Sequence, residues 1–317
     1  MNMEKTPKEQ LEAIKGYLKQ VNVVEGKSVE HIRQQMEEAV TQLPKLPNIV
    51  IEPVQMGDLS GEWVSTNEDH TEYDDEVGFE SNQQVILYFH GGGFTSGSCN
   101  YYRDLAARIS KSSGIKVLVL EYRLAPEHPY PAANEDCLFA YRWLQANGHS
   151  ADHIVLGGDS VGASLVLMTL LSLRDHGEAL PAGAFLISPH SDLVNLDGES
   201  YESRAELDPT GSLNGNQAIL THYLGSYSGP IPELLSPLRM DLGGLPELLI
   251  QVGDHEVLLS DATRLAERAT AAGVQVSLEV WENMWSVFHF LAYMLPEAEQ
   301  AISNIGQFVG ARLKIEI

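Results

Sequence analysis

The stretch GDSVG at residues 158–162 decides the fold of this chain, because one apolar run precedes it and another follows it. Residues 153–157 (HIVLG) have the character of a short buried strand, and residues 163–171 (ASLVLMTLL) that of a buried helix. A serine between glycines at such a junction is held on a tight turn with its hydroxyl exposed. The pattern predicts Ser160 as a nucleophile. The alternative is a glycine-rich turn in which Ser160 only caps the helix.

A second motif, HGGGF at residues 90–94, directly follows the buried-strand run 85–89. Successive glycines leave backbone amides bare, so the amides can approach a ligand oxygen closely. Attack of a serine on a carbonyl leaves a negative oxygen, and each donor aimed at it lowers the barrier by about 3 kcal/mol. The alternative is a flexible glycine turn, and His90 is expected to tie the loop down rather than act as a base. The predicted oxyanion hole consists of Gly91, which sets the loop, and the amide donors Gly92, Gly93 and Val161.

Strands and helices alternate from residue 84 onward, which predicts a mostly parallel sheet covered by helices on both faces. The expected strands lie near 84–89, 115–121, 153–158, 183–188, 247–252 and 274–281. The expected helices lie near 100–112, 132–147, 161–175, 261–272 and 287–313, the last broken at Pro296. Active sites in such sheets lie outside the carboxyl ends of the strands.

Two amphipathic helices are expected ahead of the sheet, at residues 8–20 and 28–42. Residues 49–54 and 59–64 are expected to pair as antiparallel strands. The acidic, polar stretch 66–82 is expected to be a loop or a disordered insertion without chemistry.

Three motifs together resemble those of the hormone-sensitive-lipase-like family of bacterial carboxylesterases: HGGGF at 90–94, YRLAPEHPYPAA at 122–133 and GDSVG at 158–162. The resemblance implies an α/β-hydrolase fold with a helical cap, acting on esters of short- to medium-chain acids. It implies cap helices at 1–45, a catalytic domain at 46–317 and a second cap segment within 189–245. Val161 departs from the alanine that the family usually has and is expected to narrow the pocket.

The acid and the base of a serine hydrolase of this fold follow the serine in the order acid, then histidine. Residues 253–261 (GDHEVLLSD) follow an expected strand, and the resemblance implies that Glu256 is the acid. Asp254 is the alternative acid. Asp261 is expected to cap the following helix.

The position of the base is anomalous. Residues 281–288 read WENMWSVF, where the family reads roughly W-x-x-M-x-H-x-F, so Ser286 stands where the resemblance places the catalytic histidine. A serine hydroxyl cannot take up a proton near neutral pH, so the relay is broken. His255 lies beside the acid at another strand end, and His289 lies about 5 Å along the axis if a helix has begun there. Since a general base must reach the nucleophile, His289 is a poor substitute.

Three explanations for Ser286 compete. We favour an engineered replacement of histidine by serine that disables the enzyme, because every other part of the machinery is intact. The others are a natural homologue that has lost catalysis, and rescue by His289. His90, Ser160, Glu256 and Ser286 each follow the end of an expected strand, so the four positions converge on one edge of the sheet.

The composition restricts the partners. The 317 residues have a formal net charge of −24, from 44 acidic against 20 basic side chains, which argues against nucleic acids and anionic membranes. Cys99 and Cys137 are too few for a disulfide framework. Without a signal-peptide core or an apolar run long enough to span a membrane, we expect a cytoplasmic protein. We expect no metal, because none of the 11 histidines has a metal-ligand spacing with cysteine or carboxylate. We expect no cofactor, because water would clear the acyl-enzyme. Homodimers are common in the family, so pairing of two copies is open.

Two alternatives to an esterase acting on a small-molecule ester remain. One is a non-catalytic protein whose pocket binds a small ligand. The other is an amidase or deacetylase on the same machinery, which passes through the same tetrahedral intermediate.

Overall fold

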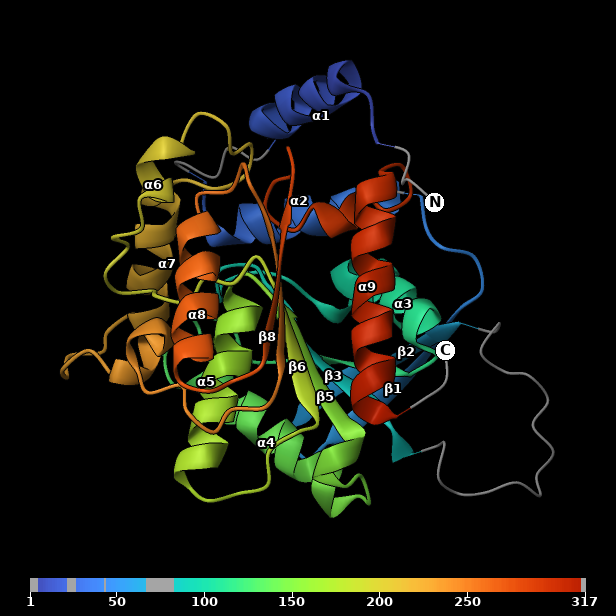
Figure 1. Cartoon of the computed structure of the whole chain (residues 1–317), viewed down its shortest axis with the longest axis vertical. Helices are drawn as coiled ribbons and strands as arrows, with labels where there is room; N and C mark the ends of the chain where they lie inside the picture. The colour runs from blue at the N-terminus through green and yellow to red at the C-terminus, as the bar shows by residue number, and fades with distance from the viewer. Residues whose placement is uncertain (1–4, 22–26, 43, 67–82, 315–317) are drawn as a thin grey trace.

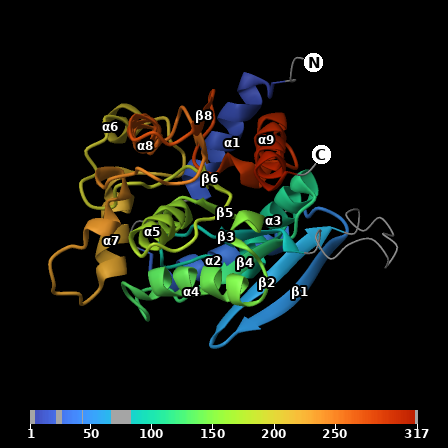
Figure 2. The same cartoon turned by 60° about the horizontal axis from the view of Figure 1, so that its bottom comes forward.

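The computed structural model describes residues 5–21, 27–42, 44–66 and 83–314, and its centre is one sheet of eight strands. The strand order is β1-β2-β4-β3-β5-β6-β7-β8; β2 pairs antiparallel with both β1 and β4, and the strands β4, β3, β5, β6, β7 and β8 are parallel to one another. The strands are β1 (Ile49–Met56), β2 (Leu59–Thr66), β3 (Val85–Phe89), β4 (Val117–Glu121), β5 (Ile154–Asp159), β6 (Gly183–Ile187), β7 (Leu248–Gly253) and β8 (Val276–Trp281). The expected opening hairpin is confirmed and lies at one edge of the sheet (Figure 2).

Helices cover both faces of the sheet, as the alternation of elements predicts. Helices α4, α5 and α8 pack on one face, and α3 and α9 on the other (Figure 1). Successive strand residues enter opposite cores: Leu87 joins the first face, while Ile86 and Tyr88 join the second. The longer helices are α1 (Lys8–Val21), α2 (Val29–Gln42), α3 (Cys99–Ser113), α4 (Ala132–Ala146), α5 (Val161–Asp175), α7 (Leu213–Leu224), α8 (Leu259–Ala271) and α9 (Pro296–Leu313).

The end of the chain differs from the expectation. The expected helix over 287–313 begins only at Pro296, and the 3-10 turn η6 (Phe288–Leu291) lies before it. Proline suits the first position of a helix, where its missing N–H has no partner to lose, so Pro296 starts α9 instead of breaking a longer helix. The part of the chain that follows β8 is therefore a loop, and it contains Ser286.

The segment 189–245 holds α6 (Ser200–Ser203), α7 and the 3-10 turns η4 (Glu233–Leu235) and η5 (Pro237–Arg239). Together with α1 and α2 it lies over the end of the sheet where the parallel strands finish (Figure 1). The expected loop at 66–82 falls on residues 67–82, outside the described ones; Thr66 ends β2.

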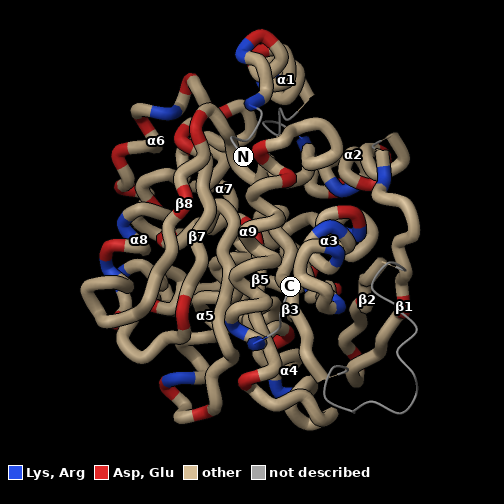
Figure 3. Tube along the Cα trace, turned by 45° about the vertical axis from the view of Figure 1, so that its right-hand side comes forward, with Lys and Arg blue, Asp and Glu red and all other residues tan. Residues whose placement is uncertain are grey.

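Acidic side chains are spread over the helices and loops instead of gathering on one face (Figure 3). Among the described residues, none of the helices combines the length and apolar character that a membrane span needs.

Candidate active site

Ser160 lies on a sharp turn between β5 and α5, with φ 51° and ψ −120°. A non-glycine residue at positive φ is strained and persists only where its surroundings hold it. A Cβ on Gly162 would collide with the carbonyl oxygens of Phe89 and His90, and one on Gly158 with the backbone of Gly162. The glycines therefore let the turn pack directly against the end of β3. Ser160 itself is half-buried, and the predicted tight turn between strand and helix is observed.

The glycine loop after β3 presents two free amides. Gly92 and Gly93 have φ of 109° and 64°, and within residues 83–314 neither N–H donates to an acceptor. A Cβ on Gly92 would collide with the carbonyl group of Ser96, so the tight turn of this loop has no room for a larger residue at position 92. Val161 is the first residue of α5, where the helix supplies no acceptor for its N–H. The three proposed oxyanion donors thus remain available to a ligand.

A buried carboxylate next to the nucleophile holds this loop. Asp159 Oδ1 accepts from Tyr88 Oη at 2.9 Å and from the Gly91 amide at 2.9 Å, and Oδ2 accepts from Tyr102 Oη at 2.8 Å. Burial raises the pKa of Asp159 to about 6, and these donors limit the rise. A Cβ on Gly91 would collide with Asp159, so only glycine fits there. Gly91 thus fixes the loop and its N–H is already used.

His90 is a structural residue, as the sequence indicates. Its ring stacks on Tyr122 with centroids 4.2 Å apart, and its Nδ1 lies 2.7 Å from the Gly91 carbonyl oxygen. The hydroxyl of Tyr122 donates to the His90 carbonyl oxygen at 2.7 Å. His90 is fully buried, and burial lowers its pKa, so it does not present a base to Ser160.

Helix α7 lies over the glycine loop. Its Ile219 is within 3.3 Å of where a Cβ on Gly93 would be, and its Tyr223 stacks on Phe94 with centroids 3.8 Å apart. The segment 189–245 therefore forms a wall beside the oxyanion donors.

Glu256 is completely buried in the loop after β7. Its Oε1 accepts from the Gly253 amide at 2.6 Å and from Ser188 Oγ at 2.8 Å, whereas its Oε2 has no partner among the described residues. Leaving such an acceptor unpaired costs about 1–3 kcal/mol. Burial raises the pKa of Glu256 well above its usual range. Asp254, the alternative acid, accepts from the Asn283 amide at 2.6 Å.

The loop that carries Ser286 is joined to the loop of Glu256 on both sides of residue 286. The Val287 amide donates to Ser188 Oγ at 3.0 Å, and Ser188 Oγ also donates to Glu256. The His255 amide donates to the Met284 carbonyl oxygen at 3.0 Å. The Ser160 amide donates to the carbonyl oxygen of Ile187, the residue before Ser188, at 2.9 Å. The structure therefore brings positions 160, 256 and 286 to one place.

Neither histidine near the end of the chain serves this site. His289 Nε2 lies 2.8 Å from Gln251 Oε1, and burial lowers the pKa of His289 to about 3. His255 Nδ1 lies 2.8 Å from Nζ of Lys15 on α1, a lysine that also lies over the Trp285 ring. Burial, and then Lys15, lower the pKa of His255. No hydrogen bond joins either ring to Ser160 or Glu256 within the described residues, so rescue by His289 is not supported.

Sequence reasoning missed His190, which comes two positions after Ser188. Its amide donates to the Ser160 carbonyl oxygen at 3.3 Å, and its ring is fully buried with neither nitrogen paired among the described residues. Burial lowers its pKa to about 4, so the ring is neutral. The sequence offered one indication of this residue: it follows the end of an expected strand, and such strand ends meet at the same edge of the sheet as Ser160.

The expectation for Asp261 was wrong. Its Oδ2 accepts from the amides of Ser191 and Asp192 at 3.0 and 3.1 Å, not from the first turn of α8. Burial raises the pKa of Asp261 to about 7. Asp261 thus fastens the start of the 189–245 segment to α8. The reason is tertiary: a distant loop supplies better-placed donors than the helix itself.

The turn after β4 makes structural contacts through Arg123 and Glu127, as expected. Arg123 donates to both carboxylate oxygens of Asp136, and Arg33 of α2 binds both oxygens of Glu127. Arg33 also donates to the carbonyl oxygens of Thr95 and Ala125. Helix α2 is therefore fixed to the glycine loop and to this turn.

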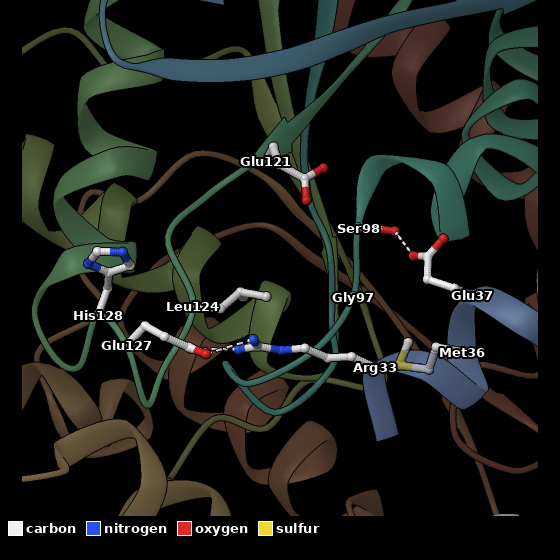
Figure 4. A pocket seen from close by; sticks show the side chains of 9 residues that line it. All are labelled: Arg33, Met36, Glu37, Gly97, Ser98, Glu121, Leu124, Glu127 and His128. Carbon is white, nitrogen blue, oxygen red and sulfur yellow. Dashed lines mark hydrogen bonds and ion pairs between the residues drawn. The ribbon is translucent and has the colours of Figure 1, made fainter. Parts of the chain in front are cut away.

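A pocket of about 500 Å³ opens beside α2 (Figure 4). In it Arg33 forms an ion pair with Glu127, and Glu37 accepts a hydrogen bond from Ser98 Oγ. Ser160, Glu256 and Ser286 do not line it, so it is a seam between α2 and the sheet end and not the candidate site. Its lining residues are Arg33, Met36, Glu37, Gly97, Ser98, Glu121, Leu124, Glu127 and His128.

Comparisons with known proteins agree with this geometry. Residues 86–290 match a family described as alpha/beta hydrolase fold. The chain is 34% identical over 277 residues to an esterase of Acinetobacter venetianus, covering 87% of each chain. It is 40% identical over 226 residues to an acetyl-hydrolase of Streptomyces hygroscopicus, covering 71% of this chain and 75% of the relative.

A solved structure extends the likeness to nearly the whole chain. The crystal structure of an esterase from the bacterial hormone-sensitive lipase family superposes with a TM-score of 0.88 at 38% identity. The match covers 97% of this chain and 99% of that esterase.

Proposed function

This chain belongs to the hormone-sensitive-lipase-like family of α/β-hydrolase-fold esterases, and on that basis we propose that it cleaves short- to medium-chain carboxylic esters through an acyl-enzyme. We propose that serine has replaced the catalytic histidine at position 286, so that turnover is far below that of a complete triad. The observation that carries this proposal is Glu256: its Oε2 is buried and unpaired among the described residues, while its Oε1 is linked through Ser188 Oγ to the loop of Ser286.

The proposed reaction begins at Ser160. Its Oγ attacks the ester carbonyl, and the amides of Gly92, Gly93 and Val161 stabilise the oxygen that becomes negative. The leaving alcohol departs, and water then hydrolyses the acyl group from Ser160, so the mechanism uses no cofactor. An imidazole at position 286 would pair with Glu256 and carry the proton. Losing one such member typically costs about 10⁴–10⁶ in turnover, and the oxyanion hole and binding leave about 10³–10⁴ over water.

We assign residues 46–317 to the hydrolase domain, and 1–45 and part of 189–245 to a cap. The contacts of α1 with His255, of α2 with the glycine loop and of α7 with Gly93 support this assignment. The net charge of −24 supports small neutral esters over nucleic acids as substrates. We also propose that the protein acts in the cytoplasm.

The test is the substitution Ser286→His. It should raise hydrolysis of a short p-nitrophenyl ester by at least about three orders of magnitude, because it returns a base that Glu256 can orient. Ser286→Ala is the matched control and should leave the rate unchanged. In the Ser286→His background, a fluorophosphonate should label Ser160, and Ser160→Ala should abolish both labelling and turnover.

An equally poor enzyme after Ser286→His would contradict the proposal. Stoichiometric binding of a metabolite, with no turnover in either form, would favour the ligand-binding alternative instead.

A further inference from the structure

The unpaired oxygen of Glu256 indicates a missing hydrogen-bond donor. Polar atoms that are buried in a protein nearly always have a partner. Glu256 Oε1 has two, yet Oε2 has none among the described residues, although the side chain is completely buried. The carboxylate is thus held rigidly with one oxygen directed away from its own anchors.

Position 286 is partly accessible and is linked to the acid through Ser188. Ser160, Ser286 and Val287 are all half-buried, whereas Glu256 and Ser188 are fully buried. Ser188 Oγ bonds to Glu256 Oε1 and to the Val287 amide, so residue 286 is adjacent to a residue that shares a hydrogen-bond partner with the acid. A serine side chain is smaller than that of histidine by about the volume of the ring, which is the size of the group proposed below.

Among the described residues, no histidine ring is hydrogen-bonded to Glu256 Oε2. His255 is engaged by Lys15, and His289 by Gln251. His190 binds the backbone of Ser160 through its own backbone, and its ring makes no hydrogen bond to Ser160 or Glu256 in the described part of the chain.

We propose that the site beside Ser286 binds an imidazole group carried by a ligand, which donates its ring N–H to Glu256 Oε2 and accepts the proton of Ser160 on its other nitrogen. This inference rests on the proposed function of Ser160 and Glu256. Imidazole fits because its neutral form has one donor and one acceptor on opposite sides of the ring and titrates near neutral pH. An ammonium group has donors only and could not take the proton. The ring belongs either to the ester itself or to a separate small molecule.

The proton balance closes with this group. As the bond from Ser160 Oγ to the carbonyl carbon forms, the ring nitrogen takes the hydroxyl proton, and the carbonyl electron pair moves to the oxygen held by the backbone amides. The imidazolium then gives its proton to the alcohol oxygen as the ester C–O bond breaks. In the second half, the ring takes a proton from water as water attacks the acyl group, and returns it to Ser160. The sum is ester plus water giving acid plus alcohol.

The first experiment adds free imidazole to the full chain and follows hydrolysis of phenyl acetate. We expect a saturable increase of about 10²-fold, the contribution typical of a positioned general base. N-methylimidazole lacks the N–H that Glu256 would accept and should rescue far less. Ser286→His, whose own ring fills the place, should not respond to imidazole. Ser160→Ala measures the direct hydrolysis by imidazole, which is subtracted.

The second experiment identifies the source of the ring. Ethyl N-acetylhistidinate and ethyl N-acetylphenylalaninate are compared without added imidazole. A preference of about tenfold or more for the histidine ester, absent in Ser286→His, assigns the ring to the substrate. Equal rates, together with rescue by free imidazole, assign it to a separate molecule.

The outcomes separate the two proposals. If Ser286→His is active but neither imidazole nor the histidine ester accelerates the unmodified chain, the imidazole site is wrong and the esterase proposal stands. An acceleration equal in Ser160→Ala also overturns the imidazole site. If Ser286→His is inactive as well, the esterase proposal itself fails.

Discussion

Asp159 and Glu256 are two buried carboxylates of the same candidate site, and they differ in how completely they are paired. Asp159 has three donors shared over both oxygens, and its pKa rises only to about 6. Glu256 has two donors on one oxygen and none on the other, and its pKa rises well above its usual range. Burial raises both pKa values; three donors offset the rise at Asp159, whereas at Glu256 there are fewer donors and the Asp208 carboxylate adds to the rise.

This contrast shows which half of the candidate site has a hydrogen-bond partner missing. The half around Asp159, which holds the glycine loop against the turn of Ser160, is complete within the chain. In the half around Glu256, only Oε1 has hydrogen-bond donors among the described residues, from Ser188 and Gly253. A carboxylate that orients an imidazole needs one oxygen for anchoring and one for the ring, and that is the arrangement of Glu256.

The largest effect is expected from Asp159→Ala, made in the Ser286→His background. Without the carboxylate the Gly91 amide loses one of its two acceptors, and Tyr102, the other, loses the group that holds its hydroxyl, so the loop that carries Gly92 and Gly93 loosens. We expect kcat for a short p-nitrophenyl ester to fall by about 10²–10³ with little change in KM. Tyr102→Phe, which keeps the carboxylate, should cost less than about tenfold. An unchanged kcat in Asp159→Ala would show that Asp159 does not position the oxyanion donors.

The two carboxylates should also differ in how much they contribute to the free energy of unfolding. Asp159→Asn replaces an acceptor of three hydrogen bonds by an amide and should lower the free energy of unfolding by about 2 kcal/mol. Glu256→Gln, in the chain with Ser286, should change it by less than about 1 kcal/mol, because the amide oxygen can keep both hydrogen bonds that Oε1 accepts. Urea unfolding at pH 7 measures both. Equal losses would contradict the contrast.

The pH dependence of stability gives the smallest effect and tests the structural role of His289. Its pKa in the fold is about 3, below the 6.5 of the unfolded chain. The unfolded chain therefore binds a proton at pH 5 that the fold does not, and this contribution to stability is present above pH 6.5 and lost as the pH falls toward 3. Between pH 7 and pH 5 the unmodified chain should lose about 2 kcal/mol more than His289→Gln.

Urea unfolding at the two pH values measures this difference. Parallel pH profiles for the two proteins would mean that His289 titrates normally and is free to act as a base.

Much of the fold was accessible from sequence because its elements are strongly patterned. Apolar runs and glycine signals placed the six parallel-sheet segments and the serine turn, and all of them are observed. The error at 287–313 came from a helical pattern that continues across Pro296, although the residues before it fold as a 3-10 turn and a loop.

The contacts within the site were less accessible. Asp159 reaches Tyr88 and Tyr102, and Ser188 reaches both Glu256 and Val287, through hydrogen bonds between segments far apart in the chain. No local pattern encodes such pairs. The same holds for Asp261, whose place at the start of α8 suggested a cap until the amides of 191 and 192 were seen to bind it.

The sequence by itself determined the sheet, the strained serine turn, the glycine loop and the serine at position 286, because each follows from residue types next to one another. Only the tertiary structure decided that Asp159 accepts at both oxygens and that, within the part of the chain it describes, Glu256 keeps one buried oxygen unpaired and is not joined to His255, His289 or His190. The physical reason is that burial and hydrogen-bond pairing are properties of neighbours in space, which the packing of separate strand ends at one edge of the sheet brings together.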